Sequence, residues 1–360
     1  MRKTPIFVGL FLLRMAAPGP LRAAESPRIV VPIQETVLSD GARRYSITLS
    51  FGGARFDAAL DTGSTGLRIL PRTVDPQDVL MSEKTETYGF GSGTVFDGVI
   101  GHGRVGFGDA GNAIAGAIPV QMITHVRCHK DNPKCPASRV DAEDYEIEGD
   151  GLPHEGFRAI LGLRTSQGAV PNPLLAIGVR RWIIDLPLDG IPRTGWLILN
   201  PTDDEIAGFV KIPMLPQFGN ARRPASDIVP GCLENLDTHS SICGGVLADT
   251  GAPGVTAVFS GRDEEIWPAG THAALTFGQA DHTVQARETL TIGRRAHASA
   301  LKFVRWDLPI NRVFAGLCPY FAFSILYDPA NLTIGFKPRD AAPGGPVGEV
   351  NMPHELSGHP

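Results

Sequence analysis

The chain has 360 residues, of which 42% are hydrophobic and 20% are charged, and its formal net charge is −5. These values are typical of a globular chain able to bury two cores. The negative charge and the lack of a sustained Lys/Arg run argue against a nucleic-acid surface. The 42 Gly and 30 Pro residues are scattered among short alternating or β-branched runs. We therefore expect an all-β protein rich in turns.

The first 24 residues have the features of a secretory signal peptide. A positively charged start precedes a short apolar run at 6–13, and small residues near Ala24 offer a cleavage site. The run is too short to span a membrane. Arg14 and Arg22 are atypical of such a peptide, so a non-cleaved anchor or a misassigned start codon stays open. We expect a periplasmic or secreted protein without stable membrane association after cleavage.

The tripeptide Asp-Thr-Gly occurs twice, at residues 61–63 and at residues 249–251. Apolar runs precede and follow each copy, which predicts strand, tight turn, strand in both places. The glycine of each copy permits close backbone approach, and the threonine hydroxyl can hydrogen-bond across the turn. Two carboxylates on similar halves of a chain can face each other, share one proton and activate a water. Two ordinary turns, each stabilised by its Asp side chain, are the alternative interpretation.

Four of the five cysteines form two pairs that are close in sequence. Cys128 and Cys135 flank one polar segment, and Cys232 and Cys243 flank another, just before the second Asp-Thr-Gly copy. Each pair can close a small disulfide loop, which agrees with export into an oxidising compartment. Cys318 lies in an apolar stretch, where we expect a buried and unreactive thiol.

A zinc site is the alternative interpretation of the first cysteine pair. Imidazole and thiolate groups are zinc ligands, and His125, Cys128, His129 and Cys135 lie close together in sequence. Their spacing matches no strong zinc pattern. Nothing else in the sequence requires a metal or an organic cofactor, and no local motif indicates a cysteine nucleophile or a Ser-His-Asp set.

The two Asp-Thr-Gly copies and four further segments resemble the pepsin-like aspartic proteases, over roughly residues 28 to 338. One of the four, residues 323–328 with 332–336, resembles the closing strands of the C-terminal lobe. Residues 88–93, Tyr-Gly-Phe-Gly-Ser-Gly, resemble the flap of that family, a hairpin whose tyrosine closes over the substrate. Residues 157–163 resemble the hydrophobic-hydrophobic-Gly element that packs beneath the first active-site loop and completes a ψ-shaped crossing of strands. Residues 313–316 are a weaker second counterpart.

The resemblance implies an all-β, bilobed fold with two related β-barrel-like lobes, each carrying one catalytic Asp on a ψ-loop. It places the N-terminal lobe at 25–190 and the C-terminal lobe at 191–338. Residues 339–360 have little apolar spacing, and we expect a flexible tail there. The interval before Asp61 has no room for an inhibitory pro-segment, so we expect the protein to be made active.

The resemblance also implies an aspartic endopeptidase that hydrolyses peptide bonds through a water activated between Asp61 and Asp249. It assigns support of this pair to Thr62, Gly63, Ser64, Thr250 and Gly251, and covering of the substrate to Tyr88, Gly89 and Phe90. We expect a monomer that acts on peptides or proteins, beside apolar residues, without a nucleic-acid partner.

Three positions near the motif bear on this assignment. Ser64 keeps the hydroxyl that bonds the first carboxylate in the family, whereas Ala252 lacks the counterpart for the second. Arg68 stands where the family has a tryptophan that supports the flap tyrosine. These departures leave open a catalytically impaired pseudoenzyme that binds peptides or acts as an inhibitor. A periplasmic structural or solute-binding protein with unrelated turn triplets is the other alternative.

Overall fold

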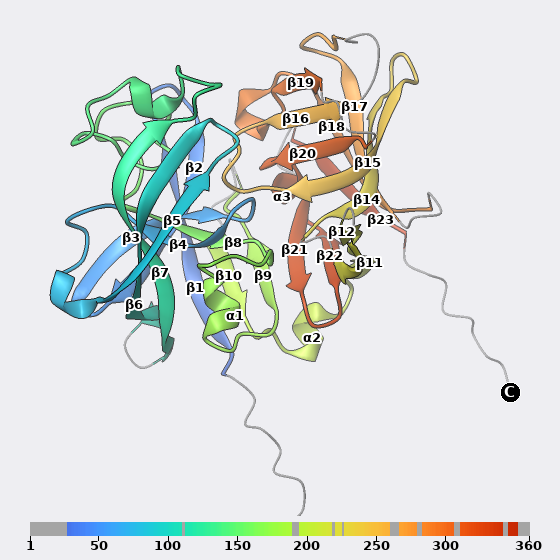
Figure 1. The fold of residues 1–360 in the computed structure, drawn as a ribbon. Helices are drawn as coiled ribbons and strands as arrows, with labels where there is room; N and C mark the ends of the chain where they lie inside the picture. The colour runs from blue at the N-terminus through green and yellow to red at the C-terminus, as the bar shows by residue number, and fades with distance from the viewer. Residues whose placement is uncertain are drawn as a thin grey trace, which may run out of the picture.

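The computed structural model describes residues 27–109, 112–188, 194–217, 220–224, 227–259, 266–278, 283–305, 310–340 and 345–351. Over these ranges the protein is mostly β, with two large sheets and a short two-stranded ribbon. The N-terminal half, blue to green in Figure 1, lies beside the C-terminal half, yellow to red. The expected all-β architecture is confirmed. The expected signal peptide at 1–24 lies outside the described residues.

The larger sheet contains strands from both halves of the chain. Its thirteen described strands have the order β11-β22-β21-β9-β10-β1-β2-β3-β8-β4-β7-β6-β5. β1 joins its two parts, because the first half of β1 pairs with β10 and the second half with β2. The strands are β1 (Ile29–Val37), β2 (Arg43–Phe51), β3 (Ala54–Asp61), β4 (Thr65–Ile69), β5 (Leu80–Gly89), β6 (Thr94–Asp109), β7 (Asn112–Cys128), β8 (Ala159–Leu163), β9 (Trp182–Asp185), β10 (Gly195–Leu199), β11 (Val210–Pro213), β21 (Phe323–Asp328) and β22 (Thr333–Pro338). The predicted lobe boundary at 190 therefore falls between β9 and β10, two neighbours in one sheet.

The smaller sheet is built from the C-terminal half alone. Its described strands have the order β19-β16-β20-β15-β14-β17-β18-β23. They are β14 (Val229–Asn235), β15 (Ser241–Ala248), β16 (Val255–Phe259), β17 (His272–Gly278), β18 (Val284–Thr291), β19 (Leu301–Arg305), β20 (Arg312–Gly316) and β23 (Val347–Val350). The ribbon is β12 (Pro216–Gln217) with β13 (Asn220–Pro224), and the helices are α1 (Pro173–Ala176), α2 (Asp203–Ile206) and α3 (Cys318–Ala322), with 3₁₀ turns at Pro76–Asp78, Pro136–Ser138 and Arg295–His297.

Both Asp-Thr-Gly copies connect two strands between which a third, distant strand is inserted. β8 is parallel to β3 and antiparallel to β4, and β20 is parallel to β15 and antiparallel to β16. The sequence of β8, Ala-Ile-Leu-Gly-Leu, is buried at every position, as expected of a strand flanked on both edges and covered on both faces. Gly162 of β8 permits the close approach, since a Cβ atom there would lie 2.8 Å from the backbone of Ser64. The predicted strand, turn, strand pattern is confirmed at both copies.

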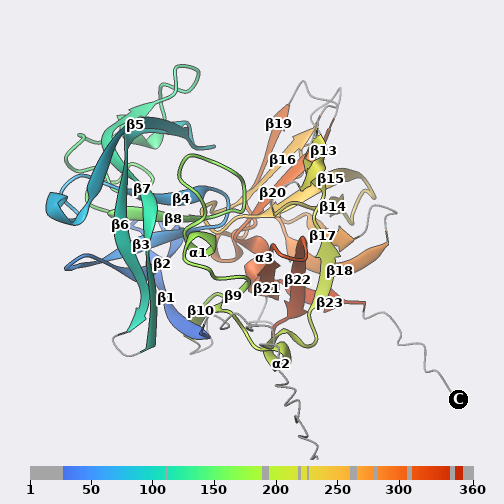
Figure 2. The same ribbon diagram turned by 60° about the horizontal axis from the view of Figure 1, so that its bottom comes forward.

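The expected flexible tail from residue 339 onward is wrong for residues 347–350. These residues form β23, which extends the smaller sheet by pairing with β18 (Figure 2). The outer edge of β18 offers unpaired backbone groups to any segment that reaches it, and sequence spacing does not reveal such an edge. At the start of the same segment Arg339 is buried and lies 2.9 Å from a carboxylate oxygen of Asp185. Residues 341–344 and 352–360 lie outside the described residues.

Both predicted disulfides are present. Cys128–Cys135 joins the end of β7 to the loop that follows it, and Cys232–Cys243 joins β14 and β15 at directly opposite positions. Cys318 is a buried free thiol, as expected. Among the helices of the described ranges, none is long and apolar enough to cross a membrane.

Glu288 leads to a prediction on the pH dependence of stability. Its side chain is buried in β18, and the Cys318 thiol donates to its Oε1 over 3.2 Å. Burial raises the pKa of Glu288 from about 4.5 to about 8. As the pH rises from about 4.5 to about 8, Glu288 is ionised in the unfolded chain but still protonated in the folded one. Over this range the free energy of unfolding therefore falls by up to about 1.4 kcal/mol per pH unit. Glu288→Gln removes this loss, because glutamine does not ionise. We therefore expect the Tm of the variant minus the Tm of wild type to increase from pH 5 to pH 8.

Calorimetry at several pH values measures this difference. Glu349→Gln changes an exposed carboxylate on the adjacent strand β23 and is the matched control, expected to leave the pH profile of Tm unchanged. Parallel Tm profiles for Glu288→Gln and wild type would contradict the prediction.

Candidate active site

Asp61 and Asp249 occupy equivalent places in the two halves of the protein. Asp61 is the last residue of β3, and Asp249 directly follows β15. Asp61 is 5% exposed and Asp249 is half-buried. Because β8 and β20 hold the strands on either side of each turn, both carboxylates lie on rigid parts of the structure.

The two turns are joined by reciprocal hydrogen bonds between their threonines. The Thr62 N–H donates to Thr250 Oγ1, and the Thr250 N–H donates to Thr62 Oγ1, each over 3.0 Å. Each hydroxyl in turn donates to a backbone carbonyl of the opposite half, Thr62 to Ala248 and Thr250 to Leu60. The sequence predicted hydrogen bonds across each turn, but the hydroxyls instead join one turn to the other.

The glycines of the two turns let each aspartate lie against the opposite backbone. A Cβ atom on Gly63 would lie 2.3 Å from Cγ of Asp249, and one on Gly251 would lie 2.7 Å from Oδ1 of Asp61. A heavy atom cannot approach so closely, so any larger residue at either position would displace the facing carboxylate. The requirement for glycine is therefore set by the opposite half of the protein.

The surroundings of the pair favour one shared proton. Asp61 Oδ1 accepts hydrogen bonds from the N–H groups of Gly63 at 2.7 Å and Ser64 at 3.2 Å. Asp249 Oδ1 accepts one from Gly251 at 2.9 Å. Burial raises the pKa of Asp249 well above its usual range, and the charge of Asp61 and a hydrogen bond between the two carboxyl groups raise it further. Such a pair presents one acid and one base to a molecule between them.

The hydroxyl of Ser64 does not bond Asp61, contrary to the expectation. Its backbone N–H does so, and Ser64 Oγ is buried without a hydrogen-bond partner among the described residues. The backbone of the turn already places two N–H groups on the carboxylate. The backbone N–H of Ser64 thus makes the hydrogen bond to Asp61 that was expected of the Ser64 hydroxyl, and this donor does not depend on the side chain.

The segment expected to be a flap is a hairpin next to the first turn. β5 pairs with β6, with Tyr88 opposite Phe96 and Gly89 opposite Val95. The Tyr88 hydroxyl accepts a hydrogen bond from the N–H of Thr65, over 3.3 Å. Phe90 packs edge-on against the rings of Tyr88 and Phe96, at centroid distances of 5.0 Å and 4.8 Å. Tyr88 therefore contacts the aspartate-bearing loop, and Gly89 and Phe90 follow it at the end of the same hairpin.

Arg68 supports the ring of Tyr88 directly. Its guanidinium carbon lies 3.5 Å from the ring centroid, an arrangement that a desolvated cation–π contact stabilises. The Arg68 side chain is 1% exposed, forms an ion pair of 3.6 Å with Glu86 of the same hairpin and donates to the carbonyl of Thr65. A planar cation thus fills the place where the resemblance expects an aromatic ring.

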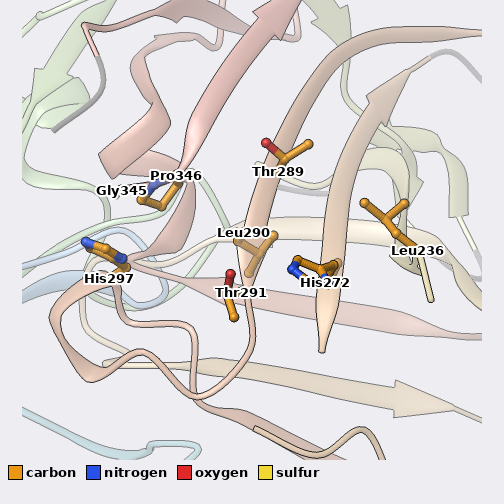
Figure 3. A pocket seen from close by; sticks show the side chains of 9 residues that line it. Leu236, His272, Thr289, Leu290, Thr291, His297, Gly345 and Pro346 are labelled. Carbon is orange, nitrogen blue, oxygen red and sulfur yellow. The ribbon is translucent and has the colours of Figure 1, made fainter. Parts of the chain in front are cut away.

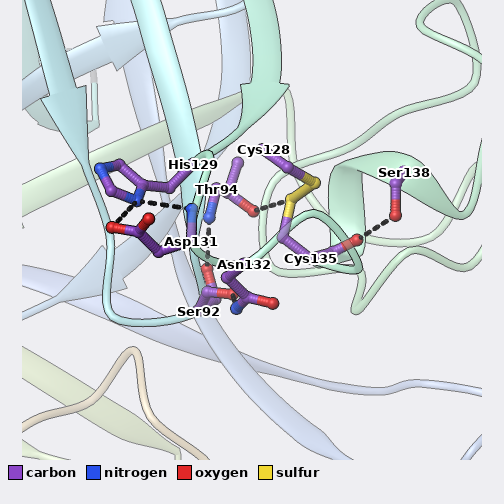
Figure 4. The surroundings of a disulfide bond; sticks show 8 residues. All are labelled: Ser92, Thr94, Cys128, His129, Asp131, Asn132, Cys135 and Ser138. Atoms are coloured by element: carbon purple, nitrogen blue, oxygen red, sulfur yellow. Dashed lines mark hydrogen bonds and ion pairs between the residues drawn. A yellow bond between two sulfur atoms is a disulfide. The ribbon is translucent and has the colours of Figure 1, made fainter.

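The tip of the hairpin is held by the disulfide loop of Cys128 and Cys135 (Figure 4). The N–H of His129 donates to the carbonyl of Gly93 over 2.7 Å, and the Asn132 side chain donates to the carbonyl of Ser92 over 2.9 Å. The glycine-rich tip is therefore fastened to a cross-linked loop.

The disulfide also decides against the zinc alternative. It consumes two of the four candidate ligands, Cys128 and Cys135. Within the described ranges, no group of three or more His, Cys, Asp or Glu side chains is arranged to hold a metal ion.

Two side chains near the aspartates were not anticipated from the sequence. The Tyr320 hydroxyl lies 2.9 Å from Thr62 Oγ1, and this tyrosine comes from the short helix α3. Glu148 places a third carboxyl group beside the pair, since its Oε1 would lie 3.2 Å from a Cβ atom on Gly251. Glu148 lies in an acidic, glycine-rich segment that matches no motif, so no local signal distinguished it.

Two cavities formed by the described residues do not include either aspartate in their lining. One, of about 200 Å³, is on the smaller sheet, with His272 and His297 on either side of Leu290 and Thr291 (Figure 3). Another, of about 180 Å³, lies between the two halves and includes Asp150 in its lining. The candidate site is therefore assigned from the chemistry of the two aspartates and not from these cavities.

Comparison with known proteins gives no further guidance, because no protein-family model and no curated protein sequence matches this chain. Function is therefore inferred from the geometry and the chemistry of the site.

The threonine hydrogen bonds lead to a prediction on stability. Thr62→Val keeps the shape of the side chain but leaves the Thr250 N–H, the Ala248 carbonyl and the Tyr320 hydroxyl without the Thr62 oxygen. Buried polar groups that lose a partner each cost about 1–3 kcal/mol. We expect the free energy of unfolding, measured in urea, to fall by about 2–4 kcal/mol.

Thr87→Val is the matched control, because Thr87 is exposed and its hydroxyl donates to Asp97 on the surface. We expect it to change the free energy of unfolding by less than about 1 kcal/mol. Equal effects of the two substitutions would show that the threonine bonds between the turns carry no special stability.

Proposed function

We propose that this protein is an aspartic endopeptidase of the pepsin-like type, with Asp61 and Asp249 as its catalytic pair. The observation that carries the proposal is the reciprocal bonding of Thr62 and Thr250, which sets two carboxyl groups face to face. The proposal includes the bilobed fold, in which β8 and β20 complete a ψ-loop around each aspartate. The matching strand pairings in the two halves support it.

The reaction follows from the single shared proton. The ionised carboxylate takes a proton from a water as the water oxygen attacks the amide carbon. The protonated carboxyl gives its proton to the carbonyl oxygen, so the tetrahedral intermediate carries two hydroxyl groups. When the carbon–nitrogen bond breaks, the carboxyl that gained the water proton passes it to the departing amine, and the other carboxylate takes a proton from one hydroxyl of the intermediate, which leaves a carboxylic acid product. The aspartates exchange roles during one turnover, and no covalent enzyme intermediate forms.

The flap hairpin covers the peptide during this reaction. Tyr88 lies over the aspartate-bearing loop, and Phe90 packs into the neighbouring apolar cluster. A cover of this kind excludes bulk water from the reacting groups. The substrate is an extended peptide bound by strand-like hydrogen bonds.

The protein acts as a monomer in the periplasm or outside the cell. Its two disulfides support an oxidising compartment.

A peptide-binding pseudoenzyme of the same fold is the second candidate. It is favoured by the carboxyl group of Glu148, which lies where it alters the electrostatics of the pair. Cleavage assays separate the two candidates, because a pseudoenzyme binds peptides without hydrolysing them.

Substitution of either aspartate tests the proposal. Asp61→Asn and Asp249→Asn keep the shape of the side chain but remove the shared proton system. We expect each to lower kcat/KM for a mixed peptide library, assayed between pH 3 and 7, by about 10²–10⁴-fold or more. Pepstatin is expected to inhibit the wild-type protein.

Asp57→Asn is the control for this test, because Asp57 is an exposed carboxylate on the same strand, β3. It is expected to retain full activity. Cleavage that persists in both active-site variants sinks the proposed mechanism, and peptide binding without cleavage by wild type selects the pseudoenzyme.

The contact between Arg68 and Tyr88 gives a further prediction. Arg68→Met removes the charge that stacks on the ring, and Tyr88→Ala removes the ring itself. A desolvated cation–π contact is worth about 2 kcal/mol, so Arg68→Met is expected to lower kcat/KM by up to about 30-fold. The double variant should lose little more than Tyr88→Ala alone, because both changes break the same contact.

Arg104→Met, an exposed arginine on β6, is the control. Fully additive losses in the double variant would show that Arg68 does not act through Tyr88.

A further inference from the structure

Glu148 lies beside the catalytic pair without belonging to it. It follows Ile147, which is held by two backbone hydrogen bonds of 2.9 Å to Phe157. A Cβ atom on Gly251 would lie 2.7 Å from Asp61 Oδ1 and 3.2 Å from Glu148 Oε1. The two carboxylates therefore flank Gly251, within a few ångströms of the position where the peptide bond is hydrolysed.

The carboxyl group of Glu148 has no hydrogen-bond partner among the described residues. Its side chain is 9% exposed, and both of its oxygens are buried and unbonded. The nearby cation, Arg44, has its Nε 3.9 Å from Glu148 Oε2, which is too long for a hydrogen bond. Arg44 and Glu148 thus form an ion pair without a hydrogen bond, and a buried carboxyl group whose oxygens accept no hydrogen bond is costly and rare.

Arg44 holds the backbone of this loop rather than the carboxylate. Its Nε donates to the carbonyl oxygen of Glu148 over 2.9 Å, and its Nη2 donates to both carboxylate oxygens of Asp150 over 2.7 Å. The guanidinium of Arg44 is thus largely committed to other acceptors. It fixes where Glu148 points while leaving its oxygens available.

The backbone of Glu148 is held in an unfavourable conformation. Its φ is 60°, and that of Asp150 is 55°, in the left-handed region that favours glycine. Strain of this kind persists where the surrounding structure imposes it, and it is concentrated at functional sites. The carboxyl group of Glu148 is therefore held near Asp61 by a strained backbone and at the cost of burying its oxygens.

The charges that face Glu148 are predominantly negative. They are Asp61 from β3, Asp249 after β15, Asp150 in the same loop and the positive charge of Arg44 from β2, while Arg164 and Arg68 act on the two aspartates. Burial raises the pKa of Glu148 well above its usual range, Arg44 opposes this rise, and the charges of Asp61, Asp249 and Asp150 add to it. A cation that entered this space could donate the hydrogen bonds that Glu148 lacks and would favour the ionised carboxylate.

We propose that Glu148 forms a subsite for a positively charged group of the substrate, immediately beside the bond that is cleaved. This inference rests on the proposed endopeptidase activity and replaces the expected preference for apolar residues alone. The cation is either the side chain of a lysine or arginine, or the free amino terminus of a short peptide. In the second case the enzyme removes short segments from the ends of peptides.

The experiment uses the full chain and peptides that differ in one charge. Cleavage of an acetylated apolar peptide is first located by mass spectrometry. Lysine or norleucine is then placed on either side of the cleaved bond in acetylated peptides. A further pair of peptides is shortened so that the amino terminus falls next to this bond. One member of this pair has a free amino terminus and the other an acetylated one. All of these peptides are assayed with wild type, Glu148→Gln and Glu143→Gln, each enzyme at its own optimum pH.

A charged partner for a buried carboxylate is worth about tenfold or more in kcat/KM. We expect wild type to prefer one cationic peptide over its neutral twin by at least this factor, and the lysine and amino-terminal pairs show which source of charge is used. Glu148→Gln should reduce the preference to less than about twofold while it still cleaves the neutral peptides. Glu143→Gln, an exposed carboxylate in the same segment, should retain it.

Equal cleavage of charged and neutral peptides by wild type, or a preference that survives in Glu148→Gln, overturns the proposal. If wild type cleaves none of the peptides, the proposed activity fails, and binding decides the subsite separately. Fluorescence anisotropy with the labelled lysine and norleucine peptides is then expected to show about tenfold tighter binding of the lysine peptide by wild type but not by Glu148→Gln. Equal affinities for the two peptides overturn the subsite as well.

Discussion

The reciprocal hydrogen bonds between Thr62 and Thr250 are the constraint on which the rest of the site depends. Each threonine uses its N–H and its hydroxyl toward the opposite half, so neither turn can move without the other. All of these groups are buried, where an unmade hydrogen bond is costly. The bonds therefore fix both the separation and the orientation of the two strands that carry Asp61 and Asp249.

This constraint has a direct electrostatic consequence. With the backbones so close, each aspartate lies against the glycine of the opposite turn, and the two carboxyl groups cannot both ionise cheaply. A third acidic side chain, that of Glu148, lies next to the same turns. Arg44 holds its backbone by donating a hydrogen bond to the Glu148 carbonyl oxygen. The proposed proton sharing and the proposed recognition of a cation are thus two results of one arrangement, which brings three carboxyl groups close together.

The hairpin of β5 and β6, which we propose as the flap, is also held by contacts from other parts of the chain. Tyr88 is held by a planar cation, and the tip of its hairpin is held by a disulfide loop. Arg68 can act in this way because the guanidinium is flat enough to stack and is paired with Glu86. A substitution that appears disruptive in the sequence is compatible with the contact, since the stacking surface is preserved and the charge is neutralised nearby.

The sequence by itself determined the features that depend on short stretches of chain. The all-β class, the two strand–turn–strand units and the two disulfides follow from apolar spacing, turn residues and cysteine separation, and the structure bears them out. Two predictions from the sequence were wrong. The hydrogen bond expected from the Ser64 hydroxyl comes from its backbone N–H, and residues 347–350, expected to be flexible, pair with the edge of β18. Only the tertiary structure brought together Thr62 with Thr250 and Glu148 with Gly251, because these contacts join residues far apart in the chain. Their geometry depends on how the whole chain packs, which no local pattern records.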